Sequence, residues 1–308
     1  MKVLLSGASG FVGSYVLRQL LAHGDAEVAA LVRDPAKAWR IQDELGRVRV
    51  LRAGLEDGAM LEEAIGAFRP SHVVHLAWSG VLGRDRNAPA QHVNAYRTMR
   101  LLELALAAGA RHFIGLGSQA EYGPCAARID ESTPTAPTTM YGAAKLASCI
   151  MASRLCDVAG ARFAWLRLFS SYGPRDNPEW MIPYLTLKLL HGERPAVTAA
   201  EQLWDYVHVE DAAAAVVAVT RTEAASGIFN LGSGSARRLR DIIETVRDAI
   251  DPALPVGFGE VPYRADQVMH LEADIGRLSR ATGWRPRVEL VEGLRGTVDW
   301  YRQQDAGP

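Results

Sequence analysis

Short apolar runs alternate with longer amphipathic stretches along residues 1–230 of the chain. Apolar runs of the length typical of buried strands cover residues 2–6, 27–33, 48–52, 72–77, 112–117 and 163–169. Stretches with the length and apolar spacing typical of helices cover residues 14–21, 59–68, 94–108, 141–158 and 211–220. This alternation predicts an α/β fold, a Rossmann-type doubly wound parallel sheet with helices on both faces.

The chain length suggests more than one structural part. A chain of 308 residues is long for a single hydrophobic core, which favours one large domain with a smaller lobe added. We predict a dinucleotide-binding domain over residues 1–171, to which residues 206–233 return. Residues 172–205 and 234–308 are predicted to form a smaller C-terminal lobe that binds the substrate.

Composition and charge exclude several classes of function. The formal net charge is −1 and no run rich in Lys or Arg occurs, which argues against a nucleic-acid surface. No apolar run approaches the roughly 18 residues that a membrane span needs, and the N-terminus enters a strand without a signal-peptide pattern. The three cysteines, Cys125, Cys149 and Cys156, lack metal-ligand spacing. We therefore expect a cytoplasmic protein without a metal.

A glycine-rich segment, Gly7-Ala8-Ser9-Gly10-Phe11-Val12-Gly13, lies between the first predicted strand and the first predicted helix. In such a turn the three glycines permit the tight bend, the approach of a phosphate and the close packing of the helix. The helix N-terminus then faces the pyrophosphate with unpaired N–H groups. A purely structural turn is the alternative. The predicted cofactor contacts are Gly7, Ser9, Gly10, Phe11, Val12 and Gly13.

The end of the second predicted strand addresses the choice of cofactor. Sites selective for NAD place an acidic residue there, whereas this chain has Val32 and Arg33. A guanidinium at Arg33 suits a 2′-phosphate, which predicts NADP(H) rather than NAD(H). Asp34 follows Arg33 directly, so NAD(H) remains the alternative cofactor. The alternative role of Arg33 is that of a solvated charge in a loop.

A second motif, Tyr141-Gly142-Ala143-Ala144-Lys145, places a phenol and an ammonium on one helical face. A free tyrosine has a pKa near ~10, too high for a base at neutral pH, and a nearby positive charge favours the phenolate. A tyrosine on the helix surface is the alternative reading of Tyr141 alone. Together with the glycine turn, the pair predicts a nicotinamide-dependent enzyme.

The chain resembles a known family, the extended short-chain dehydrogenase/reductases that act on nucleotide sugars. The resemblance covers nearly the whole chain. It rests on the glycine turn, Tyr141 with Lys145, and the following ordered motifs: His75-Leu76-Ala77, Gly117-Ser118-Gln119-Ala120-Glu121-Tyr122-Gly123, Leu166-Arg167-Leu168-Phe169-Ser170-Ser171-Tyr172-Gly173-Pro174, Asp205-Tyr206-Val207-His208-Val209-Glu210-Asp211, Phe229-Asn230-Leu231-Gly232-Ser233-Gly234 and Gly283-Trp284-Arg285-Pro286.

The resemblance implies roles for individual residues. Tyr141 is implied to be the acid/base, Lys145 to lower the pKa of Tyr141 and hold the cofactor ribose, and Ser118 to bind the substrate oxygen. Leu55, Leu76 and Ala77 join the predicted cofactor contacts. The predicted substrate contacts are Trp78, Gln119, Ser170 and Arg264. The family also implies a homodimer formed by the helices at 98–108 and 141–158.

Departures from the family pattern narrow the reaction. Family dehydratases carry an Asp-Glu pair where this chain has Gln119 and Ala120. The family usually has Asn at Ser170 and Arg at Trp204, so the sugar and phosphate contacts are not carried over in detail. Glu121 replaces a common apolar residue, either to touch the substrate or to form a structural ion pair.

Two reactions remain. One is NADPH-dependent reduction of a nucleotide-linked sugar, at C4 of a 4-keto-6-deoxyhexose, and the other is 4-epimerisation with bound NAD. The missing acid after the second strand favours reduction. An alternative of another class is an inactive NADP-binding regulatory module, which the retained Ser118, Tyr141 and Lys145 disfavour. Ketone reductases of acyl-chain, terpenoid or flavonoid substrates are a further alternative.

Overall fold

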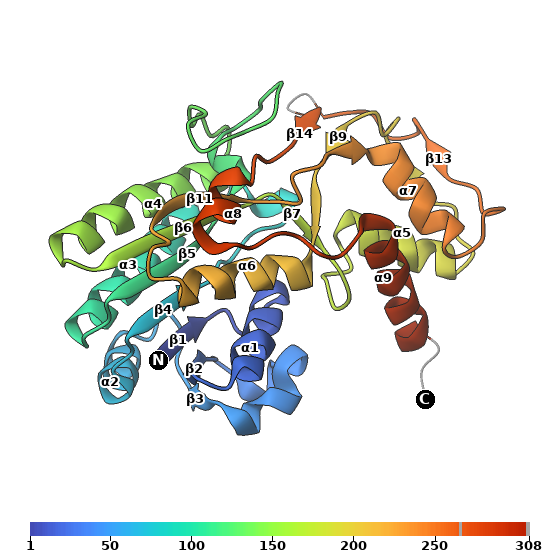
Figure 1. Cartoon of the computed structure of the whole chain (residues 1–308). Coiled ribbons are helices and arrows are strands. Elements are labelled where there is room, and N and C mark those ends of the chain that lie inside the picture. The colour runs from blue at the N-terminus through green and yellow to red at the C-terminus, as the bar shows by residue number, and fades with distance from the viewer. Residues whose placement is uncertain (265–266, 306–308) are drawn as a thin grey trace.

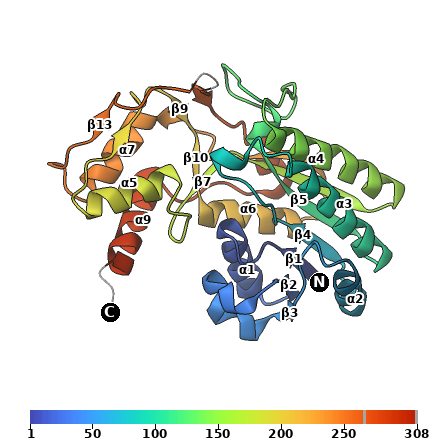
Figure 2. The same cartoon turned by 180° about the vertical axis from the view of Figure 1, so that it is seen from behind.

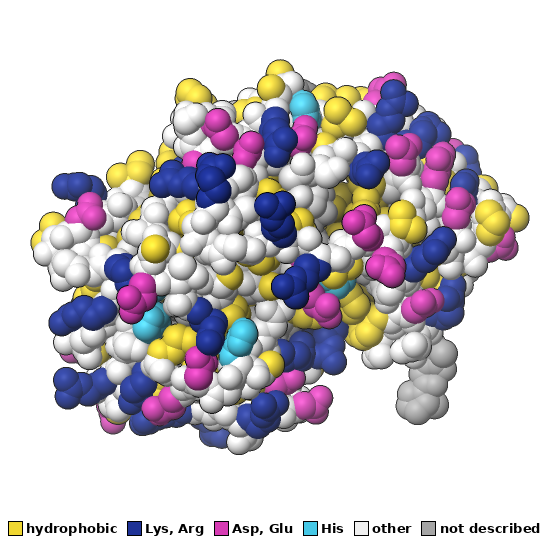
Figure 3. All heavy atoms as spheres, in the orientation of Figure 1, with side chains coloured by type: hydrophobic (Ala, Val, Ile, Leu, Met, Phe, Trp, Pro, Cys, Tyr) yellow, Lys and Arg dark blue, Asp and Glu magenta, His cyan; other side chains and the backbone are white. Residues whose placement is uncertain are grey.

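The structure is a computed structural model that describes residues 1–264 and 267–305 (Figure 1). The predicted substrate lobe over 234–308 is therefore described apart from residues 265–266 and 306–308. Among the described residues, no helix is long and apolar enough to cross a membrane. On the face shown in Figure 3, basic and acidic side chains are interspersed, as the near-zero net charge suggests.

The centre of the fold is a seven-stranded sheet in which every neighbouring pair is parallel. Its order is β11-β6-β5-β4-β1-β2-β3. The bounds are β1 (Lys2–Ser6), β2 (Glu27–Leu31), β3 (Arg49–Leu51), β4 (His72–His75), β5 (His112–Ser118), β6 (Arg162–Leu168) and β11 (Gly227–Leu231). The sheet confirms the predicted Rossmann-type α/β fold. Because all strands run the same way, their carboxyl ends meet at one edge, where ligands bind in such sheets.

Helices cover both faces of the sheet (Figures 1 and 2). One hydrophobic core joins the sheet to α1 (Phe11–His23) and α6 (Val209–Arg221). The other core joins it to α2 (Gly58–Phe68), α3 (Gln91–Ala107) and α4 (Met140–Val158). This two-sided burial explains why the strands are continuous apolar runs rather than alternating ones. The predicted helices are present, and each begins one to three residues before its predicted start, while α3 ends at Ala107, one residue before its predicted end.

A separate group of elements lies at the other end of the molecule in both views (Figures 1 and 2). The helices α5 (Met181–Leu190), α7 (Leu239–Asp248) and α9 (Leu290–Asp305) share a core that includes Leu185, Ile243 and Leu294. The same group of elements contains the short strands β8 (Ala196–Val197), β9 (Leu203–Trp204), β12 (Arg237–Arg238), β13 (Gly257–Phe258) and β14 (His270–Leu271). The helix α8 (Gly276–Thr282) instead contacts β11 and α6.

The chain passes between these two parts through a small parallel sheet. β7 (Ser170–Tyr172) follows β6 and pairs with β10 (Tyr206–His208). From β10 the chain enters α6 and then β11, which pairs with β6 at the edge of the main sheet. The segment that we expected to return, 206–233, thus contains β10, α6 and β11. The exact division at 171, 205 and 233 stays a prediction.

Candidate active site

The glycine turn lies where β1 ends and α1 begins. Gly7 has a φ of +80°, and a Cβ atom there would lie 2.6 Å from the Ala77 nitrogen. A Cβ atom on Gly13 would lie 1.9 Å from the Gly7 oxygen. Gly10, which precedes α1, supplies no side-chain cap, so the first N–H groups of α1 face outward. The cradle therefore fits a dinucleotide pyrophosphate.

Two cavities meet at this turn. The larger, of about 560 Å³, extends from Phe11 past Ser118 toward the lobe, and the smaller occupies about 290 Å³. The larger cavity is lined by the predicted residues Gly7, Gly10, Phe11, Val12, Gly13, Leu76, Trp78, Ser118, Gln119, Tyr141, Lys145, Ser170 and Arg264. The smaller one is lined by Gly7, Ser9, Gly10, Arg33, Leu55, Leu76, Ala77 and Trp78. Every residue that the sequence proposed for the site thus lines one or both of these cavities. Their binding roles stay predictions.

Ser118, Tyr141 and Lys145 meet at the carboxyl edge of the sheet. Ser118 ends β5, and Tyr141 and Lys145 lie in the first turns of α4, whose N-terminus is capped by Thr139 Oγ1 accepting from Gly142 N at 3.1 Å. Close packing is possible because position 142 is glycine: a Cβ atom there would lie 2.3 Å from the Ala120 oxygen.

Two cations lie near Tyr141, and the role implied for Lys145 stays a prediction. Burial raises the pKa of Tyr141, while a hydrogen bond with Ser118 and the charge of Arg86 lower it. The Lys145 ammonium lies 6.0 Å from the Tyr141 ring centroid and donates instead to the Leu116 oxygen at 2.6 Å. It also sits 3.8 Å from the centroid of the Trp78 ring. Burial lowers the pKa of Lys145 to about 7. Arg86, whose guanidinium carbon lies 5.4 Å from the Tyr141 ring centroid, is a second cation beside Tyr141 that the sequence did not indicate.

The smaller cavity carries two arginines. Arg33 is 74% exposed and lies 3.6 Å from the Glu56 carboxylate. Arg97, in α3, lies 3.6 Å from the same carboxylate and lines the same cavity. Arg97 was missed because only the sheet topology brings the start of α3 beside the end of β2. Asp34 caps its own turn by accepting from Ala36 N, so its side chain is used outside the cavity.

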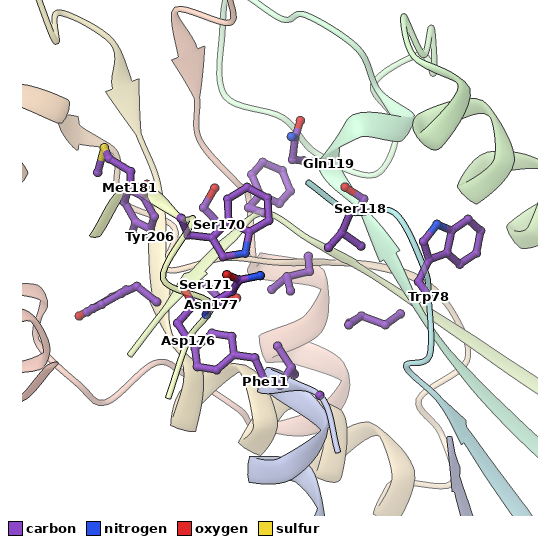
Figure 4. Close-up of a pocket in the computed structure, with 18 of the residues that line it drawn as sticks. Phe11, Trp78, Ser118, Gln119, Ser170, Ser171, Asp176, Asn177, Met181 and Tyr206 are labelled. Carbon is purple, nitrogen blue, oxygen red and sulfur yellow. The ribbon is translucent and has the colours of Figure 1, made fainter. Parts of the chain in front are cut away.

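The lobe side of the larger cavity is rich in aromatic groups. Figure 4 shows Ser118 and Trp78 on one side and Met181 and Tyr206 on the other. Trp204 also lines this cavity, and its indole donates to Ser170 Oγ at 2.8 Å. The two departures from the family pattern at 170 and 204 are therefore in contact. Trp180 also lines the cavity.

Asp176 is a buried acid in this wall that sequence reasoning missed. Its side chain is labelled beside Asn177 in Figure 4, and the residue is 6% exposed. Burial raises its pKa to about 7, against a hydrogen bond from Asn177 N and the charge of Arg40. The only signal in the sequence is its place after Tyr172-Gly173-Pro174, a motif assigned to the family as a whole.

Glu121 has a structural position. It is fully buried and accepts hydrogen bonds from Ser118 N at 2.8 Å, Trp165 Nε1 at 2.9 Å and Arg167 Nε at 2.8 Å. Of the two alternatives open from the sequence, the structure favours the buried ion pair. Because Glu121 holds the Ser118 backbone, it also fixes where β5 ends.

Possible metal ligands do not gather anywhere in residues 1–264 and 267–305: no cluster of three His, Cys, Asp or Glu side chains is present there. Cys149 and Cys156 are buried in the core between the sheet and α4. His208 caps α6 through Nδ1, which accepts from Glu210 N at 3.4 Å, so its ring has a structural role.

The fold and the site define a dinucleotide-binding α/β protein in which Ser, Tyr and Lys side chains meet beside a glycine turn. Residues 3–232 match the NAD dependent epimerase/dehydratase family. The chain therefore belongs to that family, which confirms the resemblance inferred from the motifs.

Similar proteins span nearly the full chain. The dTDP-glucose 4,6-dehydratase of Salmonella typhimurium is 27% identical over 98% of this chain and 92% of its own. The UDP-glucose 4-epimerase of Mycolicibacterium smegmatis is 27% identical over 99% of each chain. The solved structure of Thermus thermophilus UDP-glucose 4-epimerase, a complex with NAD, has a TM-score of 0.88 and 28% identity, covering 98% of this chain and 99% of that one.

Proposed function

We propose that this protein is an NADPH-dependent reductase of a nucleotide-linked sugar, which reduces the C4 ketone of a 4-keto-6-deoxyhexose. The observation that carries the proposal is the meeting of Ser118, Tyr141 and Lys145 in one cavity with the glycine turn. The family membership and the named activities of the relatives support a nicotinamide cofactor and a nucleotide-sugar substrate.

The choice of reduction rests on two features. Gln119 and Ala120 follow Ser118, so no carboxyl group is available there for the elimination of water. Arg33 and Arg97 give the smaller cavity two guanidinium groups against the single carboxylate of Glu56. An excess of positive charge favours a cofactor with a 2′-phosphate, and NADP(H) suits a reductase that consumes its cofactor.

The chain's own residues supply the proton chemistry. A bound nicotinamide supplies the hydride. Tyr141 donates its phenolic proton to the carbonyl oxygen of the substrate, and Ser118 hydrogen-bonds that oxygen and the phenol. Lys145, held between the Leu116 oxygen and the Trp78 ring, is available to the cofactor ribose. Trp78, Gln119, Ser170 and Arg264 are the proposed substrate contacts.

A 4-epimerase with bound NAD is the second candidate. It is favoured by the similarity to two UDP-glucose 4-epimerases, one of them solved with NAD. The same Tyr141 and Ser118 serve both reactions, since an epimerase oxidises and then reduces the same carbon. The difference lies in whether the reduced cofactor is consumed.

The deciding experiment mixes the protein with NADPH and a panel of nucleotide-linked 4-keto-6-deoxyhexoses, and follows NADPH absorbance and the product alcohol. Stoichiometric consumption supports the reductase. Conversion of a nucleotide hexose to its epimer without NADPH consumption supports the second candidate. Tyr141→Phe is the matched control, expected to abolish turnover and to bind NADPH as the unaltered protein does. Activity equal to that of the unaltered protein contradicts the proton role of Tyr141.

We also propose a homodimer formed through α3 and α4. These helices pack together, and their outer faces carry Tyr96, Ile150 and Met151, which are 68%, 56% and 51% exposed. Large apolar side chains gathered on neighbouring helices favour a protein contact. Light scattering on the purified protein measures the mass, and a mass near that of one chain contradicts the proposal.

A further inference from the structure

We propose that Arg86 is an electrostatic positioning residue, whose guanidinium sets the ease with which the Tyr141 phenol loses and regains its proton. The inference rests on the proposed function, in which Tyr141 moves that proton. Arg86 lines the larger cavity, and its guanidinium carbon lies 5.4 Å from the Tyr141 ring centroid.

The backbone fixes Arg86 against α4. Tyr141 N donates to the Arg86 oxygen at 2.8 Å, and Met140 N donates to Asn87 Oδ1 at 3.1 Å. Two of the first N–H groups of α4 are thus satisfied by the loop that carries Arg86, rather than by water. Arg86 Nε also donates to the Val81 oxygen at 3.3 Å. The first two bonds fix the loop beside the start of α4, and the Nε bond restrains the guanidinium near the phenol ring.

Within the described part of the chain, Arg86 forms no ion pair with a carboxylate. Arg84, two residues earlier in the same loop, instead pairs with Glu179. The guanidinium is half-buried, so solvent screens its field less than at an exposed site, and the Tyr141 ring lies within 5.4 Å of it.

The other groups that face Tyr141 cannot replace this charge. Ser118 contributes a hydrogen bond, and Glu121 acts in the opposite direction because its carboxylate disfavours a phenolate. Lys145 is directed to the Leu116 oxygen, and burial lowers its pKa to about 7, so its charge is partial at neutral pH. A guanidinium stays protonated at every working pH. Among the described residues that line the larger cavity, Arg40 and Arg264 also carry guanidinium groups, and Arg86 is the one whose charge acts on Tyr141.

The consequence follows from the proton balance. In reduction the phenolic O–H bond breaks, an O–H bond forms on the substrate oxygen, and a phenolate remains on Tyr141. Arg86 stabilises that phenolate. In the oxidative direction the same charge eases formation of the phenolate that accepts the proton.

The test measures the ionisation of Tyr141 directly, by NMR of protein labelled with ¹³C at the tyrosine ζ carbon. The signal is assigned by its loss in Tyr141→Phe. We expect Arg86→Gln to raise the Tyr141 midpoint by about one to three pH units, as loss of an opposite charge at this distance does. Arg86→Lys is expected to restore most of the difference. Arg84→Gln, which removes a carboxylate-paired charge from the same loop, is expected to leave the midpoint unchanged.

Equal Tyr141 midpoints in the unaltered protein and Arg86→Gln overturn the proposal, as does a signal that stays protonated to the same alkaline limit in both. So does an equal shift in Arg84→Gln. With a keto-sugar that the protein reduces, the alkaline limb of the pH profile of kcat/KM is expected to shift to higher pH in Arg86→Gln. A higher KM with an unmoved limb means that Arg86 binds substrate instead. Absence of any turnover by the unaltered protein defeats the proposed function, while the NMR midpoints still decide the role of Arg86.

Discussion

Replacing Glu121 by Gln is expected to destabilise the protein strongly, although the two side chains have nearly the same shape. Oε1 of Glu121 accepts from Ser118 N and Trp165 Nε1, and Oε2 accepts from Arg167 Nε. A glutamine oxygen can keep the first two bonds. Its NH₂ group then faces the Arg167 donor, so the buried guanidinium loses its charge partner.

The size of the effect follows from the burial. The Arg167 and Glu121 side chains are 3% and 0% exposed, and removing one partner of a buried pair costs about 3–5 kcal/mol. The contact of Arg167 with the Tyr122 ring at 4.4 Å is present in both proteins and does not change the difference. We therefore expect a loss of about 3–5 kcal/mol in the free energy of unfolding.

Urea unfolding followed by circular dichroism measures this loss. With a slope of about 3 kcal/mol/M, the midpoint falls by roughly 1–1.7 M. The matched control is the double variant Glu121→Leu with Arg167→Met, which removes both charges and is expected to cost much less than the two single changes together. A midpoint in Glu121→Gln within about 0.2 M of the unaltered protein, or a fully additive double variant, refutes the reasoning.

Two further predictions concern the cavities. Arg97→Gln is expected to weaken NADPH binding about tenfold and to leave NADH binding unchanged, since a charge-assisted bond contributes about 1.5–3 kcal/mol. Calorimetry measures both affinities, with Arg100→Gln as the control variant. An equal loss of affinity for both cofactors contradicts the prediction. Burial raises the pKa of Asp176 from 3.8 to about 7. The contribution of the protonated Asp176 carboxyl to folding stability is therefore fully present below pH 3.8 and is lost as the pH rises through 7. Asp176→Asn is therefore expected to match the unaltered protein in thermal stability at pH 4 and to exceed it by about 4 kcal/mol at pH 8. The same stability at pH 8 argues against a raised pKa at Asp176.

The main elements were predictable because their signals are local. Each strand of the main sheet from β1 to β6 is a short apolar run, and the glycine turn and the Tyr141–Lys145 spacing each lie within one segment. The order of the strands was not readable from these runs, because parallel pairing joins segments that are far apart in the chain. β2 and β4 end two residues before the predicted limits of 33 and 77, where the chain leaves the sheet to shape the cavities.

The missed residues share a different cause. Arg86 and Arg97 are ordinary charged residues in a loop and a helix, and only the fold brings them to Tyr141 and Glu56. The direction of the Lys145 ammonium was also beyond the sequence, since the i, i+4 spacing fixes the helical face but not the rotamer. The residues with local motifs could be predicted, whereas the charges that surround them required the tertiary structure.

The contact between Ser170 and Trp204 has a consequence for how this site changes over evolutionary time. The two residues lie on different strands, β7 and β9, yet the Trp204 indole donates to the Ser170 hydroxyl within the cavity wall. A single replacement at 204 leaves the hydroxyl without its donor, and a single replacement at 170 removes the acceptor of a half-buried indole. Because either replacement alone breaks the same hydrogen bond, the energetic effect of a change at one position is expected to depend on which residue stands at the other.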